Sequence, residues 1–88
     1  MLAKCLGYHV IKQCKELDEN LKEFLILKTN FFVFSKHNSN DDEKVHFHIY
    51  LELKKWLSPL EIQKIFNVER FCVNIVYCSR KDIIEYID

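Results

Sequence analysis

One nine-residue segment, 45–53, alternates between apolar and polar or amphipathic side chains, and this pattern constrains the fold more than any other feature of the chain. Its apolar positions are Val45, Phe47, Ile49, Leu51 and Leu53, and the positions between them are His46, His48, Tyr50 and Glu52. Successive side chains of a β-strand point to opposite faces, so a period of two residues predicts a strand. This strand is expected to bury its apolar face and to present two histidines on the other.

The other segments predict a mixed fold of strands and helices. Further strands are expected at 6–12, 31–37 and 71–78, and helices at about 18–28, after Ser58 and after Ser79. Ser58, Pro59 and Glu61 have the spacing of a capping box with proline at the first helical position. The polar segment 38–44 is typical of a hairpin connection. The order β-α-β-β-α-β-α predicts an α+β, ferredoxin-like or RNA-recognition-like (RRM-like) sandwich, with helices on one face of an antiparallel sheet and the other face available for a ligand.

The length and the charge indicate the class of protein. The chain has 88 residues, of which 49% are hydrophobic, and 13 Lys+Arg balance 13 Asp+Glu. A chain of this length supports one modest core, so a single domain is expected over residues 1–88. No apolar run approaches the roughly 20 residues of a membrane span, and the first residues lack a secretory signal, so an intracellular protein with reduced cysteines is expected. Zero net charge gives no basic surplus, so any argument for nucleic-acid binding depends on individual residues.

Histidines dominate the candidate chemistry. His46 and His48 lie two residues apart on one strand face, about 6.5–7 Å along the backbone, which is close enough to ligate one ion. His37 ends the preceding strand, and the hairpin would bring it alongside them. The three imidazoles predict a metal site, with a polar strand face that binds no metal as the alternative. His9, on the first strand, is expected to be a structural or surface residue.

The histidine strand resembles a known family motif. Residues 44–51, with His46-Phe47-His48 at their centre, look like the second motif of the HUH endonucleases, in particular the rolling-circle replication initiators (Rep proteins) of geminiviruses and circoviruses. In that family a glutamate on the preceding strand completes the metal site, and a Tyr-x-x-Lys motif on a late helix provides the nucleophile. Residues 79–88 are similar to the geminivirus form of this third motif, which places the nucleophile at Tyr86, and the first motif would fall on residues 8–12. The resemblance extends over essentially the whole chain.

The sequence departs from the family pattern at two positions. His37 stands where the acidic ligand is expected, so the site becomes all-imidazole, which favours Mn²⁺ over Mg²⁺. The lysine of the third motif would fall at position 89, one past the end of the sequence. Residues 77–80 also resemble the circovirus form of this motif, with Arg80 in place of lysine. Tyr77 is therefore a second candidate nucleophile, but it is expected in a strand, and Tyr86 is favoured.

The resemblance implies a function. It implies a metal-dependent enzyme that nicks and joins single-stranded DNA at a replication origin, specific for sequence and structure, through a 5′-phosphotyrosine, with Mn²⁺ or Mg²⁺ as cofactor. The residues expected to contact DNA are Tyr8, Lys12, Tyr50, Arg80 and Lys81. Glu52 would support the metal site or act as a fourth ligand. A helicase domain C-terminal to this one and host replication factors are candidate partners, and the host nucleus is the expected location for a protein of a eukaryotic virus.

Two other readings remain open. A non-catalytic RRM-like module that binds RNA or single-stranded DNA fits the topology, although Val45 and Phe47 are bulky where that module has small residues. A purely structural or regulatory metal-binding domain fits the histidines. Metal-independent binding without cleavage would favour the first reading, and metal-dependent stabilisation without nucleic-acid binding would favour the second.

Overall fold

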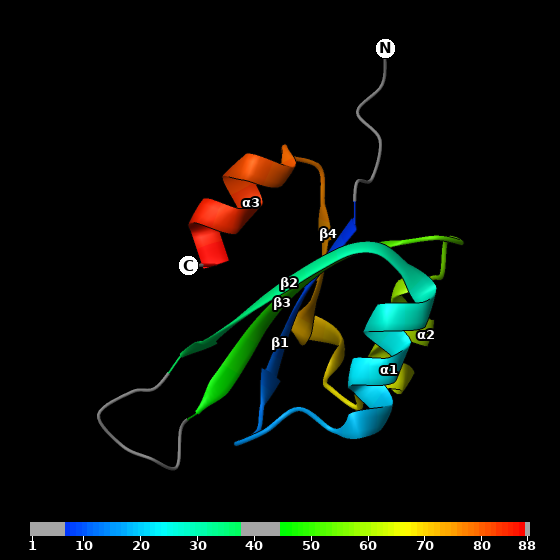
Figure 1. Ribbon diagram of the computed structural model, residues 1–88, viewed down its shortest axis with the longest axis vertical. Coiled ribbons are helices and arrows are strands. Elements are labelled where there is room, and N and C mark those ends of the chain that lie inside the picture. Colours follow the sequence, from blue (N-terminus) through cyan, green and yellow to red (C-terminus); the bar gives the residue numbers. More distant parts are fainter. Residues whose placement is uncertain (1–6, 38–44, 88) are drawn as a thin grey trace.

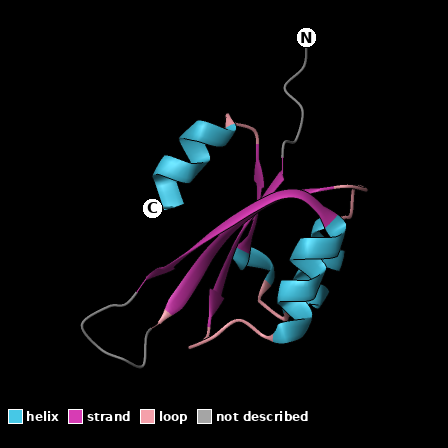
Figure 2. Ribbon diagram, viewed as in Figure 1, coloured by secondary structure: helices cyan, strands magenta, loops and turns pink. Residues whose placement is uncertain are grey.

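The computed structural model describes residues 7–37 and 45–87 as a sheet with helices (Figure 1). The elements are β1 (Gly7–Gln13), α1 (Glu19–Lys28), β2 (Thr29–His37), β3 (His46–Leu53), α2 (Pro59–Phe66), the 3₁₀ turn η2 (Arg70–Cys72), β4 (Val73–Val76) and α3 (Arg80–Ile87). Figure 2 shows the same alternation of strands and helices by colour. The expected hairpin connection at 38–44 lies outside the described residues. The order β-α-β-β-α-β-α is confirmed.

The sheet positions the histidines. Its strand order is β2-β3-β1-β4, and all three neighbouring pairs are antiparallel. In this register His37 lies opposite His46, and His9 lies opposite Tyr50. Directly opposite residues of an antiparallel pair share a face of the sheet. His46, His48 and Tyr50 alternate along β3, so all four histidines of the chain lie on one face.

The other face carries the main core. α1 and α2 pack on this face, where their buried residues meet the apolar side of β3. This core includes Leu25, Phe47, Ile49, Leu51, Ile62 and Phe66. Asp18 accepts a hydrogen bond from the Asn20 backbone at the start of α1. Ser58 and Glu61 form the expected capping box at the start of α2. The α+β class and the antiparallel sheet are therefore confirmed.

The third helix lies on the histidine face. α3 crosses this face on the side of the sheet away from α1 and α2 (Figure 1). Ile83 and Ile87 of the helix are buried against Tyr50 and Val76 in a second, smaller core. The face that the sequence leaves available for a ligand is thus partly covered, and the uncovered part contains the three histidines at the β2–β3 end.

The last strand is shorter than the sequence pattern indicates. Residues 70–72 form a 3₁₀ turn, and β4 ends at Val76. Tyr77, expected in the strand, instead lies in the connection to α3 with 58% of its surface exposed. Within the described part of the chain, β4 pairs with β1 from Gly7 to Val10, so the apolar alternation of the sequence extends past the last residue of the strand.

Two smaller expectations concern cysteines and membranes. The described cysteines, Cys14, Cys72 and Cys78, are free thiols, and Cys5 lies outside the described residues. None of the helices within 7–37 and 45–87 combines the length and hydropathy that crossing a lipid bilayer requires.

Candidate metal centre

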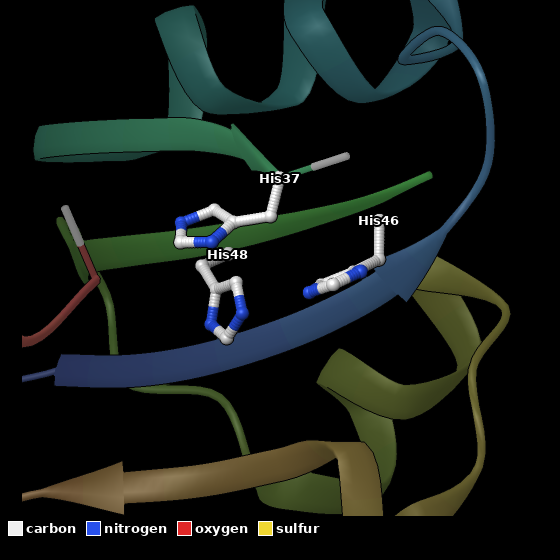
Figure 3. Close-up of side chains that lie close together, drawn as sticks. All are labelled: His37, His46 and His48. Carbon is white, nitrogen blue, oxygen red and sulfur yellow. The ribbon is translucent and has the colours of Figure 1, made fainter. Parts of the chain in front are cut away.

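Three imidazoles meet at the ends of β2 and β3. One ring nitrogen from each of His37, His46 and His48 lies within 4.8 Å of the others, so the three side chains are close enough to hold a metal ion (Figure 3). The centroids of the His37 and His48 rings lie 4.5 Å apart, and those of His46 and His48 lie 5.0 Å apart. The predicted convergence of these three residues is confirmed.

The hydrogen bond of His37 leaves one ring nitrogen for an ion. Nε2 of His37 lies 2.7 Å from the carbonyl oxygen of Ile87. A carbonyl oxygen only accepts, so Nε2 carries the proton and donates. In the neutral ring Nδ1 then has the lone pair, and this is the nitrogen that can ligate a metal.

The surroundings of His48 favour its neutral form. Burial lowers the pKa of His48, and the neighbouring charges of His37 and His46 lower the pKa further. Burial and charge repulsion both disfavour a cationic imidazole. Metal ions bind the neutral ring, so this pKa shift favours metal binding.

His9 contacts the cluster formed by His37, His46 and His48, which the sequence reasoning did not predict. Its Nε2 lies 2.9 Å from Nδ1 of His48, and the two ring planes are inclined by 21°. His9 is only 6% exposed, and burial, followed by the charge of His48, lowers its pKa to about 4. A signal was present in the sequence: in the expected topology the first and third strands are neighbours, so a histidine on the first strand can lie beside His48.

Tyr86 lies next to this cluster. Its ring meets the His9 ring edge-on, with 5.7 Å between the ring centroids, and 73% of its surface is exposed. His9, Tyr77, Asp82 and Tyr86 are among the residues that line one open hollow on this face. Both candidate tyrosines therefore border the same hollow, and Tyr86 is the one in ring contact with a histidine of the cluster.

Glu52 binds α3 and is not part of the histidine site. Its carboxylate accepts two hydrogen bonds from the Arg80 guanidinium, at 2.6 and 3.0 Å, and a third from the Tyr50 hydroxyl at 2.6 Å. The bonds from Arg80 are the main cause of a lowered pKa for Glu52. Arg80 also lies 4.0 Å above the ring centroid of Phe31. The expectation that Glu52 supports or ligates the metal disagrees with this structure, because the carboxylate is bound to Arg80.

Most of the expected DNA contacts also disagree with the structure. Tyr8 is 1% exposed and donates its hydroxyl proton to the Leu57 carbonyl, and Tyr50 is buried beneath α3. Neither ring offers a face for stacking. Lys12 lies on the face covered by α1 and α2 and donates to the Phe66 carbonyl.

The two basic residues of α3 differ in their surroundings. Arg80 holds the helix to the sheet, as described above. Lys81 is exposed on α3, so of the five expected contacts it is the one whose side chain still suits a DNA backbone. The basic residues predicted from their place in the sequence are therefore largely used within the protein.

Comparison of the chain with protein-family models, with curated proteins and with solved structures found no match. The functional conclusion therefore rests on the residues and geometry of the chain itself.

Proposed function

We propose that this chain is a metal-dependent endonuclease of the HUH type that nicks and rejoins single-stranded DNA, with Tyr86 as its nucleophile. The observation that carries the proposal is the placement of Tyr86 on the helix that also hydrogen-bonds a histidine of the cluster. Ile87, the next residue, accepts the hydrogen bond from His37. A candidate nucleophile and a candidate metal site thus share one face of the sheet.

The ligand set suits a transition metal. His37, His46 and His48 supply three nitrogen donors and no carboxylate. Imidazoles prefer transition metals, whereas carboxylates suit Mg²⁺, so Mn²⁺ is the more suitable of the two expected cofactors. When bound, the ion would neutralise the phosphate and polarise one of its non-bridging oxygens.

The protein residues provide the nucleophile and its placement. The Tyr86 oxygen attacks the phosphorus, the bond from phosphorus to the 3′ oxygen breaks, and the 5′ phosphate remains on tyrosine. The tyrosine proton is lost to water, and the departing 3′ oxygen takes one up. The reverse attack by a 3′ hydroxyl rejoins the strand. A neutral phenol is a weak nucleophile, so alignment by α3 and neutralisation of the phosphate are both needed.

The RRM-like alternative fits the histidine face less well. That module stacks bases on exposed aromatic residues of its two central strands. Here the central strands are β1 and β3, and the tyrosine that β3 places on this face, Tyr50, is buried beneath α3. The topology of the module is therefore present without its stacking surface.

Covalent capture tests the proposal. A pool of single-stranded stem-loop oligonucleotides labelled at the 3′ end is incubated with the protein and Mn²⁺, and adducts are separated on denaturing gels. We expect a labelled adduct with the unmodified protein and with Tyr77→Phe, and none with Tyr86→Phe or after chelation of the metal. No adduct with any oligonucleotide, or loss of the adduct in Tyr77→Phe alone, would contradict the proposal.

A further inference from the structure

His9 is a buried imidazole in contact with the metal centre, and the proposed reaction gives it no role. It lies on β1, a central strand that is flanked by β3 and β4. Its neighbours on this face are His48 on one side and Tyr86 of α3 on the other. A polar ring in such a position requires an explanation, because burying a polar group without a partner is costly.

We propose that His9 is a positioning residue of the metal centre. Its Nε2 accepts a hydrogen bond from Nδ1–H of His48, and this bond directs Nε2 of His48 to the ion. The inference deepens the proposed function and rests on it, since it assigns a role within the same metal site.

The direction of this hydrogen bond decides whether His48 can bind a metal. A neutral imidazole has one N–H group and one lone pair. Nδ1 of His48 lies 2.9 Å from His9, so it takes part in the bond between the two rings. If Nδ1 donates, Nε2 of His48 keeps its lone pair for the ion. If Nδ1 accepts, Nε2 carries the proton and cannot ligate.

His37 provides an internal comparison. The Ile87 carbonyl takes the N–H of that ring and leaves the other nitrogen for the ion. Ligating histidines in proteins generally donate their second N–H to a carboxylate, a carbonyl or a water, and the bond fixes the orientation of the ring. His9 would do for His48 what the Ile87 carbonyl does for His37. At 6% exposure, His9 also leaves water little room to act as a substitute acceptor.

The same ring connects the metal site to Tyr86. The His9 and Tyr86 rings meet edge-on at an interplanar angle of 87°, with 5.7 Å between the ring centroids. A change at His9 that keeps an aromatic ring should preserve this contact while it removes the hydrogen bond. The two effects can therefore be separated by the choice of substitution.

Two variants isolate the hydrogen bond. His9→Phe keeps a planar ring of similar size but has no acceptor. His9→Gln places an amide oxygen near the position of Nε2, so it restores an acceptor. Co²⁺ is a suitable probe because its absorption spectrum reports on the ligands around it, and affinities for Co²⁺ and Mn²⁺ are measured by calorimetry without DNA.

We expect His9→Phe to weaken binding of both ions by about 10- to 100-fold and to alter the Co²⁺ spectrum. His9→Gln should bind close to the unmodified protein and keep its spectrum. Equal affinities and spectra for the unmodified protein and His9→Phe would overturn the inference, as would an unmodified protein that binds no Co²⁺.

A measurement on the unmodified protein does not depend on the folding of any variant. Histidine ring ¹⁵N shifts distinguish the two neutral tautomers. We expect the proton of His48 on Nδ1, and a proton on its Nε2 in the metal-free protein would contradict the inference. A protein that binds Co²⁺ through these residues but forms no DNA adduct would instead refute the proposed function and leave the role of His9 intact.

Discussion

The carbonyl oxygen of Ile87 accepts a hydrogen bond from Nε2 of His37, with 2.7 Å between the two atoms, although 50 residues separate them in the sequence. The bond joins the end of α3 to the candidate metal centre. It therefore couples the docking of this helix to the orientation of a candidate metal ligand, and Tyr86 immediately precedes Ile87.

A divalent transition metal should stabilise the folded protein through the three histidines. A ligand that binds only the folded state adds about 2.7 kcal/mol of stability at 100 times its Kd. We compare the two proteins at the Mn²⁺ or Co²⁺ concentration that stabilises the unmodified protein by this amount. At that concentration, His46→Ala should lose most of the metal-induced gain in stability. The gain is measured as the increase in melting temperature when the ion is added.

Cysteines are the alternative ligands for a soft ion. Cys72→Ser is the matched control, because Cys72 is a free thiol in the described part of the chain and lies outside the histidine cluster. This variant should keep the full metal-induced increase in melting temperature. A loss in Cys72→Ser that equals the loss in His46→Ala would place the ion elsewhere.

The ion pair between Glu52 and Arg80 should make the docking of α3 sensitive to acid. The hydrogen bonds from Arg80 hold the pKa of Glu52 below its ordinary value of 4.5. A carboxylate with a lowered folded-state pKa stabilises the fold above the unfolded pKa, and this contribution disappears as the pH falls through the folded pKa. Glu52→Gln should therefore lower the melting temperature at pH 7, and the difference from the unmodified protein should shrink below about pH 4.5.

Glu85→Gln serves as the comparison for this titration, since Glu85 is an exposed carboxylate on the same helix. Its melting temperature should follow that of the unmodified protein at every pH. If the deficit of Glu52→Gln stays constant from pH 7 to pH 3, the carboxylate does not stabilise the fold through its charge.

The sequence predicts most of the fold because local signals agree with one another. The alternation at 45–53 and the capping box at Ser58 each specify an element that the structure contains. The predicted end of the last strand was wrong, because β4 stops at Val76 although the apolar alternation continues to Tyr77. Local sequence patterns also do not predict that α3 packs on the histidine face, since this placement depends on contacts between distant residues such as Ile83 and Tyr50.

The sequence predicted the three candidate ligands of the site, but it did not predict how the residues around them are used. Hairpin register alone brings His37 beside His46, and this part of the prediction is confirmed. The assignments of Tyr8 and Tyr50 to a DNA surface failed because both aromatic rings are used in the two cores. Charge and aromatic character in a sequence do not distinguish a side chain that binds a partner from one that binds its own protein.

Gly7 should not tolerate a side chain. A Cβ atom at this position would lie 2.2 Å from the Leu51 carbonyl oxygen, so either β1 or β3 would have to shift. Forcing atoms into a packed region generally costs about 1–3 kcal/mol. Gly7→Ala should lower the urea midpoint accordingly, and Asn30→Ala, at an exposed position of β2, is a suitable comparison. A midpoint for Gly7→Ala that equals that of the unmodified protein would show that the strands do not approach so closely.

The docking of α3 can be weakened without replacing any of the three candidate metal ligands. Ile83 and Ile62 are both buried isoleucines, the first in the α3 core and the second in the main core. Shortening either to valine should cost about 0.5–1.5 kcal/mol. Ile83→Val should therefore speed hydrogen exchange of the α3 amides about fivefold, a factor equivalent to about 1 kcal/mol, because local opening follows local stability.

Ile62→Val should lower global stability by a similar amount and leave the exchange of α3 relative to the rest of the protein unchanged. If α3 is the element that presents Tyr86, Ile83→Val should reduce the yield of the DNA adduct more than Ile62→Val does, with both variants saturated with Mn²⁺. Equal adduct yields, together with faster exchange in α3, would mean that the position of this helix does not limit the reaction.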